Sequence, residues 1–165
     1  MLLYLRKWHI MQLDLINMEE RSTKININMV KLTSTEAILV SLLQQKLDVV
    51  VIETGANDGL RGVPVQTMRS NLKQIITRIR ASQPAAVIAL IQMEAMPNMG
   101  RIYTESFREA FPSLAREEKV TLMPFLLDGV AGIRDLNQGD GIHPNEEGER
   151  IVAQNVWKAL KPLLQ

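Results

Sequence analysis

The chain of 165 residues has no cysteine, and its only histidines are His9 and His143. Disulfides and thiolate chemistry are therefore excluded, and we expect no metal site, because structural zinc needs four Cys or His ligands. No apolar run approaches the roughly 18 to 20 residues that span a bilayer. Arg6 and Lys7 interrupt the first apolar residues before a signal-peptide core forms. We expect a soluble protein, cytoplasmic by default.

An excess of charge of one sign is also missing. The chain has 19 basic and 18 acidic residues, which leaves a net charge of +1. The basic residues are scattered among acidic ones and form no positive stripe, so we expect no nucleic-acid partner. The length and the hydrophobic share of 46% suit one globular domain over residues 1–165.

Glycine and proline are absent from the first 54 residues, whereas the rest of the chain holds all nine glycines and all seven prolines. Thr33 and Glu36 fit a capping box, and the apolar spacing after them predicts a helix over about 34–47. Residues 25–30 partly alternate apolar and polar side chains, which is compatible with a strand. The N-terminal strand region is therefore atypical for an α/β domain.

Strands and helices alternate from Asp48 onward. Short, apolar, β-branched runs predict buried strands at 49–52, 86–91 and 120–123. Apolar residues at helical spacing predict helices at 64–81, around 103–114 with a kink or break at Pro112, and after Pro144. This alternation predicts an α/β fold, in which a parallel sheet lies between two layers of helices.

Two motifs lie in loops where such a sheet carries its functional residues, at the carboxyl ends of the strands. Gly55-Ala56-Asn57-Asp58 follows the first of the buried strands, and Asp140-Gly141-Ile142-His143-Pro144 precedes the last helix. Each motif alone also fits an ordinary loop. Asn57 and Asp58 suit a turn, and Asp140 can cap a turn while His143 faces solvent. Their joint occurrence favours a catalytic site.

With their flanking residues, these motifs resemble the SGNH hydrolases, also called GDSL esterases and lipases. The resemblance rests on Thr54 to Gly62, Met96 to Gly100 and Asp140 to Asn145. It covers residues 42–165, whereas residues 1–41 diverge. It implies a flavodoxin-like three-layer α/β/α fold with strand order 2-1-3-4-5. The nearest subgroup is that of the arylesterases, lysophospholipases and acyl-thioesterases.

The resemblance also implies roles for particular residues. Asn57 would donate its side-chain amide to the oxyanion, and Gly55 would let the backbone pass close. His143 would be the general base, and Asp140 the carboxylate that orients it. The family hydrolyses esters and thioesters of small acyl substrates without a cofactor. Met96, Pro97 and Asn98 would contact the substrate, although packing is the better explanation of the cluster of Met93, Met96 and Met99.

One block of the family is missing. Its nucleophile is the serine of a Gly-Asp-Ser-Leu run, and a second block supplies a Ser-Gly pair; no serine of this chain has a glycine neighbour. No nucleophile is therefore assigned among the seven serines, Ser22, Ser34, Ser41, Ser70, Ser82, Ser106 and Ser113. Two hypotheses follow. The chain is either an ester hydrolase with an unrecognised nucleophile, or an inactive SGNH-fold protein that at most binds acyl ligands or partners.

Overall fold

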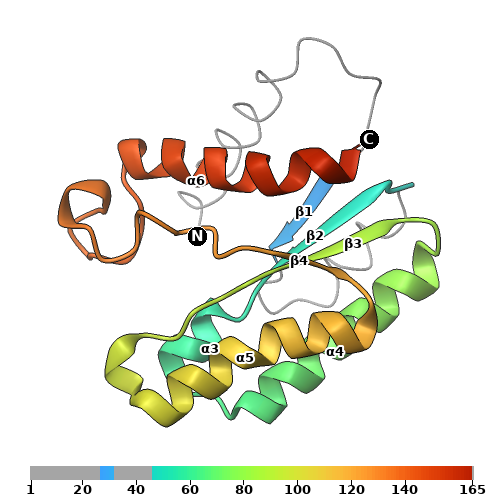
Figure 1. Cartoon of the computed structure of the whole chain (residues 1–165), viewed down its shortest axis with the longest axis horizontal. Coiled ribbons are helices and arrows are strands. Elements are labelled where there is room, and N and C mark those ends of the chain that lie inside the picture. Colours follow the sequence, from blue (N-terminus) through green and yellow to red (C-terminus); the bar gives the residue numbers. More distant parts are fainter. Residues whose placement is uncertain (1–26, 32–45, 165) are drawn as a thin grey trace. The chain divides into compact units, whose positions relative to one another are not determined.

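The computed structural model describes residues 27–31 and 46–164, and Figure 1 shows it coloured along the sequence. The described residues form two compact units that divide after Phe125. The sheet unit comprises the described residues up to Phe125, and the C-terminal unit runs from Leu126 to Leu164.

The sheet unit is built on parallel strands that adjoin one another in sequence order. Ile27 pairs with Val49, and Val49 pairs with Val87 on its other side. The first four residues of the second strand are at most 2% exposed, as expected for an apolar strand buried on both faces. The three strands predicted after Asp48 are confirmed. The described strands are β1 (Ile27–Lys31), β2 (Val49–Glu53), β3 (Val87–Ile91) and β4 (Thr121–Met123).

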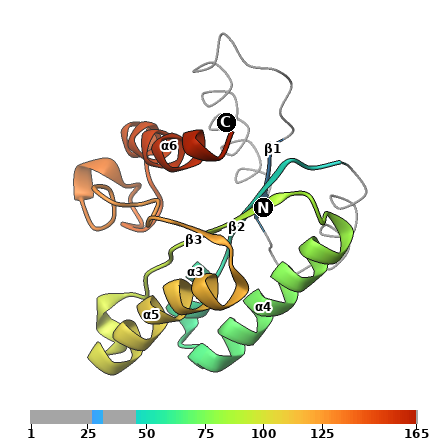
Figure 2. The same ribbon diagram turned by 45° about the vertical axis from the view of Figure 1, so that its right-hand side comes forward.

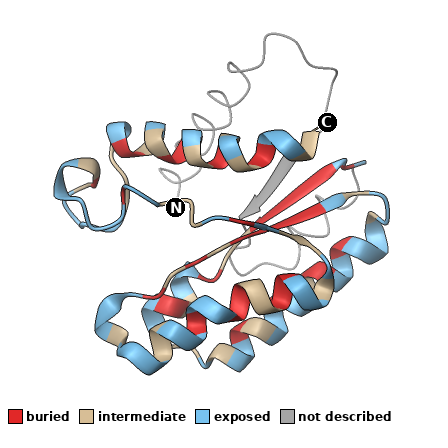
Figure 3. Ribbon diagram, in the orientation of Figure 1, coloured by how far each residue is buried: buried red, intermediate tan, exposed pale blue. Residues whose placement is uncertain are grey.

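Two long helices lie side by side along one face of this sheet (Figures 1 and 2). They are α4 (Val65–Ser82) and α5 (Arg101–Glu118), and both were predicted within a few residues. Their apolar stripes are buried and their outer faces exposed, as Figure 3 shows in red and pale blue. Shorter elements precede them, α3 (Ala56–Arg61) after β2 and the 3₁₀ turn η1 (Pro97–Met99) after β3.

Pro112 lies inside α5, and of the kink or break predicted there the break is wrong, because the helix continues to Glu118. A proline has no N–H to donate to the carbonyl four residues earlier, which here belongs to Arg108. The side-chain amide of Gln92, just after β3, donates to that Arg108 carbonyl at 3.0 Å. The hydrogen bond that proline removes is therefore replaced from outside the helix.

The C-terminal unit consists of a long loop followed by a helix. Its elements are the 3₁₀ turn η2 (Arg134–Leu136), α6 (Glu146–Leu160) and the 3₁₀ turn η3 (Lys161–Leu164). The helix begins after Pro144, as predicted, and Asn145 caps it by accepting a hydrogen bond from the Gly148 amide at 3.1 Å. Its buried apolar residues recur at helical spacing, at Val152, Ala153, Val156 and Leu160.

The predictions for the N-terminal third have mixed outcomes. The possible strand at 25–30 corresponds to β1, which pairs with β2 along its whole length. The helix predicted at 34–47 lies mostly outside the described residues, and its last two residues, Lys46 and Leu47, are not helical. Within the described part of the chain, none of the helices is both long enough and apolar enough to cross a bilayer.

Candidate active site

Asn57 lies at the start of α3, immediately after the carboxyl end of β2. It is the second residue of the helix and is exposed. Gly55 precedes the helix with φ of +106°, a conformation that other residues rarely adopt. A β-carbon at this position would also lie 3.1 Å from the ring of Phe111. Glycine is therefore needed here for the backbone to pass over the aromatic ring, and the part of Gly55 in catalysis stays a prediction.

An aromatic row on α5 supports this loop and helix. We use the name for Tyr103, Phe107 and Phe111, which are spaced four residues apart and whose neighbouring ring centroids are 5.9 and 5.4 Å apart. Phe107 faces Gly59 of α3, where an added β-carbon would lie 3.1 Å from the ring. Small residues on α3 and large rings on α5 thus allow the two helices to approach closely.

Asp58, the neighbour of Asn57, lies in a partly buried position. Burial raises the pKa of the Asp58 carboxyl above its ordinary value, and the positive charge of Arg61 opposes this change. Burial, and then the charge of Asp58, raise the pKa of Tyr103, so its hydroxyl keeps its proton at neutral pH. Tyr103 is therefore a neutral hydrogen-bond donor beside α3.

The loop after β3 lies beside α3 and contains the residues predicted to contact substrate. Met96, Pro97 and Asn98 are exposed, which leaves them accessible to a ligand. Met93 is 3% exposed and belongs to the core. The packing interpretation is thus correct for Met93, while contact of the three exposed residues with substrate stays a prediction.

Asp140 and His143 form a hydrogen-bonded pair in the C-terminal unit. The Asp140 Oδ2 and His143 Nδ1 atoms are 2.6 Å apart. The other carboxylate oxygen of Asp140 accepts hydrogen bonds from the backbone amides of Ile142 and His143, both at 3.0 Å. The same aspartate therefore caps the turn with one oxygen and binds the imidazole with the other. The turn-capping alternative raised by the sequence is therefore confirmed, and the catalytic role of the pair stays a prediction.

These contacts set the charge of Asp140 and favour one tautomer of His143. The hydrogen bonds from the His143 amide, the imidazole and the Ile142 amide hold the pKa of Asp140 well below its usual range. Asp140 is thus ionised at neutral pH, and its Oδ2 accepts a hydrogen bond from the Nδ1–H group of His143. A neutral His143 ring then carries its lone pair on Nε2, which is the form required of a general base.

Side-chain amides hold the loop that carries this pair. Asn137 is 7% exposed, and its amide donates to the carbonyls of Val130 and Ile133, both at 2.7 Å. The backbone of Asn137 forms an isolated antiparallel bridge with Pro144, directly after His143. Because these bonds add to the backbone N–H donor that each carbonyl already has, Asn137 ties the loop to the two turns before it. Sequence reasoning missed this residue, because one asparagine in a polar loop has no distinctive pattern.

Two further residues attach the His143 end of the loop to the residues before it. The Gln138 amide N–H donates to the His143 carbonyl at 2.7 Å, and its side chain donates to the Pro144 carbonyl at 2.8 Å. The Asn145 side chain donates to the Asp135 carbonyl at 2.8 Å while capping α6. The backbone on both sides of His143 is therefore tied to a fixed framework.

The predicted site residues are thus divided between the units. Asp140 and His143 lie together in the C-terminal unit, whereas Gly55, Asn57 and the loop of Met96 belong to the sheet unit. A shared cleft between His143 and Asn57 stays a prediction. The serines within the described ranges lie on the long helices, Ser70 and Ser82 on α4 and Ser106 and Ser113 on α5. Ser22, Ser34 and Ser41 lie outside the described residues.

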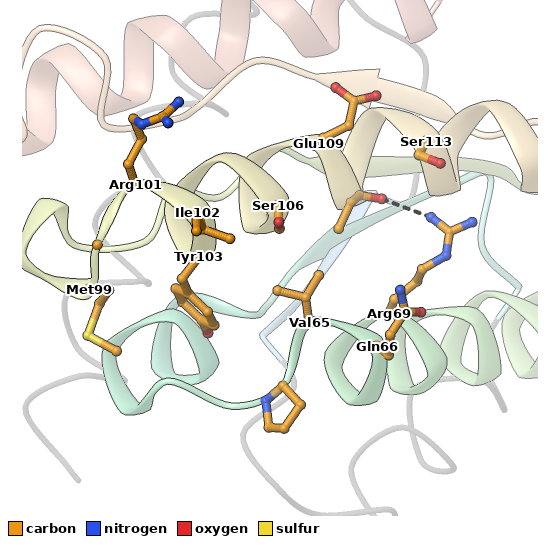
Figure 4. A pocket seen from close by; sticks show the side chains of 13 residues that line it. Val65, Gln66, Arg69, Met99, Arg101, Ile102, Tyr103, Ser106, Glu109 and Ser113 are labelled. Atoms are coloured by element: carbon orange, nitrogen blue, oxygen red, sulfur yellow. Dashed lines mark hydrogen bonds between the residues drawn. The ribbon is translucent and has the colours of Figure 1, made fainter.

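No cluster of three or more metal-ligating side chains occurs among residues 46–164. A shallow, mainly apolar groove of about 1150 Å³ lies between the first halves of α4 and α5 (Figure 4). Val65, Ile102 and Ser106 are among its lining residues, and it contains none of the predicted site residues. The groove is therefore not the predicted site.

Comparisons with known proteins agree with the motifs. The model of the GDSL-like lipase/acylhydrolase family matches residues 20–151. Esterase TesA of Pseudomonas aeruginosa is 40% identical over 123 residues, which are 74% of this chain and 60% of the relative. An arylesterase of Vibrio mimicus is 39% identical over 125 residues, or 75% of this chain and 62% of the relative. The chain thus spans about three fifths of the length of these relatives.

Solved structures show the same likeness. A crystal structure of TesA matches with a TM-score of 0.71 at 40% identity, covering 78% of this chain and 71% of that one. The psychrotrophic esterase EstA from Pseudoalteromonas sp. matches with a TM-score of 0.72 at 34% identity, covering 78% and 69%. These matches and the parallel sheet confirm the predicted fold class, the three-layer α/β/α fold of SGNH hydrolases.

Proposed function

Because this chain belongs to the GDSL-like lipase/acylhydrolase family, we propose that it hydrolyses carboxylic esters or thioesters of small acyl substrates. The observation that carries the proposal is the contact of 2.6 Å between Asp140 Oδ2 and His143 Nδ1. This contact supports the proposal, because a carboxylate that binds Nδ1 of an imidazole orients Nε2 to accept a proton. The names of the relatives, an esterase and an arylesterase, support acyl esters as the substrate class.

In the proposed mechanism, His143 Nε2 accepts the proton of the hydroxyl group that attacks the ester carbonyl. The charged imidazolium is stabilised by the Asp140 carboxylate and then donates its proton to the departing alcohol or thiol. Asn57 donates its side-chain amide to the negatively charged oxygen of the tetrahedral intermediate. One such neutral donor contributes roughly 3 kcal/mol to the transition state.

The nucleophile is the component that remains unassigned. No serine has the glycine neighbour of the family's Gly-Asp-Ser block. This observation favours a second candidate function, a non-hydrolytic member of the family that binds acyl ligands. In triad enzymes, loss of one member leaves only about 10³ to 10⁴-fold of catalysis over water.

Hydrolysis of para-nitrophenyl butyrate by the purified chain distinguishes the two candidates. For a hydrolase, we expect His143→Ala to lower kcat/KM by about 10³-fold or more, and Asp140→Asn to lower it by a similar factor, because the correct tautomer is lost. Asp128→Asn is the matched control, since it replaces another exposed aspartate of the same unit. Wild-type hydrolysis equal to that of His143→Ala and of buffer alone would favour the second candidate.

A further inference from the structure

The orientation of Asn57 depends on the support that α3 receives from α5. The helix has six residues, Ala56 to Arg61, and a helix this short is unstable by itself in water. Its contacts with Phe107 and Phe111 are made through Gly59 and Gly55. Such contacts limit how far α3 can approach α5, but they are not directional and do not fix its rotation.

Tyr103 supplies a directional contact at the other end of α3. Its hydroxyl oxygen lies 2.8 Å from the Val63 carbonyl and 3.2 Å from the Asp58 carbonyl. The Asp58 carbonyl also accepts hydrogen bonds from the backbone amides of Gly62 and Val63, which end the helix. Tyr103 thus joins the hydrogen bonds that end α3. One of the two carbonyls that it contacts belongs to Asp58, the residue after Asn57. Figure 4 shows the Tyr103 ring pointing from α5 toward this segment.

The base from which Tyr103 reaches α3 is well fixed. Its ring packs beside Phe107, which is fully buried. At the far end of α5, Glu117 pairs with Lys73 of α4 at 2.6 Å and also with Arg69. Burial raises the pKa of the hydroxyl, so it remains a donor throughout the neutral range.

We propose that Tyr103 is a positioning residue, whose hydroxyl fixes the end of α3 and thereby the direction of the Asn57 side chain. This inference rests on the proposed function, in which Asn57 contacts the oxyanion. Tyr103 itself does not touch the reacting atoms. Its loss affects the reaction only through Asn57.

Backbone amide exchange measured by NMR tests the physical part of the proposal without any activity. In Tyr103→Phe we expect the Val63 and Gly59 amides to exchange about tenfold faster than in the wild type, because one hydrogen bond of ordinary strength is lost. Amides of β2 and β3 should not change. Thr104→Val is the matched control, since it removes a neighbouring hydroxyl that bonds only within the first turn of α5. Unchanged exchange at both amides and an unchanged Asn57 side-chain signal would overturn the proposal.

A double-mutant cycle in the ester assay tests the catalytic part. We expect Tyr103→Phe to lower kcat about tenfold with little change in KM, but to change kcat less than about twofold in the Asn57→Ala background. An equal loss in both backgrounds would show a role independent of Asn57 and would overturn the proposal. If the wild type does not hydrolyse the ester, the proposed function fails, and amide exchange alone decides whether Tyr103 positions Asn57.

Discussion

The two units hold their site-bearing segments by different forces. In the sheet unit, Gly55 and Gly59 bring the Asn57 segment into contact with the rings of Phe111 and Phe107. In the C-terminal unit, the segment around His143 is held by hydrogen bonds from side chains such as Asn137. The first segment is held by close packing, and the second by directional hydrogen bonds.

The difference follows from where each segment lies. Asn57 follows a buried strand directly and lies within a helix, so the backbone around it is largely satisfied by regular structure. The loop from Leu126 to Asn145 includes only one short 3₁₀ turn, η2. Its carbonyls must therefore find donors elsewhere, and amide side chains supply them.

Replacing Asn137 tests the directional arrangement and should have the largest effect. Asn137→Ala removes the side-chain donor to the carbonyls of Val130 and Ile133, each of which keeps one backbone N–H donor, so we expect a loss of about 1.5 to 3 kcal/mol in the stability of this unit. Urea unfolding followed by the fluorescence of Trp157, which lies on α6, measures it. Asn71→Ala, an exposed asparagine on α4, is the control. A loss below about 1 kcal/mol would contradict the role of Asn137.

Adding one methyl group tests the arrangement that depends on shape. In Gly59→Ala, the new β-carbon would lie 3.1 Å from the Phe107 ring and 3.2 Å from the Ala95 backbone. The backbone cannot move aside easily, so we expect a loss of about 1 to 2 kcal/mol, although alanine favours the helix. Gly139→Ala, where no atom lies within 4 Å, should change stability by less than about 0.5 kcal/mol. Equal effects of the two substitutions in thermal unfolding would remove the distinction.

The pKa values of two aspartates provide the mildest test, because no residue is changed. NMR titration should place Asp58 above the ordinary value of 3.8 because of burial, and Asp140 below it because of its hydrogen bonds. The Asp140 contribution to stability is therefore complete above its unfolded pKa and is lost as the pH falls toward the folded value. Asp58 has the opposite sign, since its folded form binds the proton more tightly and favours folding at low pH. Two aspartates with equal pKa values would contradict the prediction.

Much of the framework was predictable because the sequence patterns are local. The β-branched run predicted β2, and the apolar spacing after Pro144 predicted α6. The pairing of Asp140 with His143 followed from a motif of four residues. The roles of Asn137 and Tyr103 were not predictable, because each depends on carbonyls that only the folded backbone brings within reach.

Pro112 gives a second example of a contact that the local sequence does not predict. The general effect of proline on a helix predicts a kink or a break, and the helix does not break here, where Gln92 supplies the missing donor. The pattern of α5 contains no information about Gln92, which belongs to the end of a strand. Local rules therefore fail where a distant side chain compensates.

The amide of Gln92 also links two positions that selection would otherwise treat separately. If residue 112 regained a backbone N–H, the helix would satisfy the Arg108 carbonyl itself, and the Gln92 donor would become redundant. With proline in place, exchanging Gln92 for an apolar residue removes the side-chain donor to the Arg108 carbonyl. Homologues are thus expected to vary at these two sites in concert, and an engineer who alters one should inspect the other.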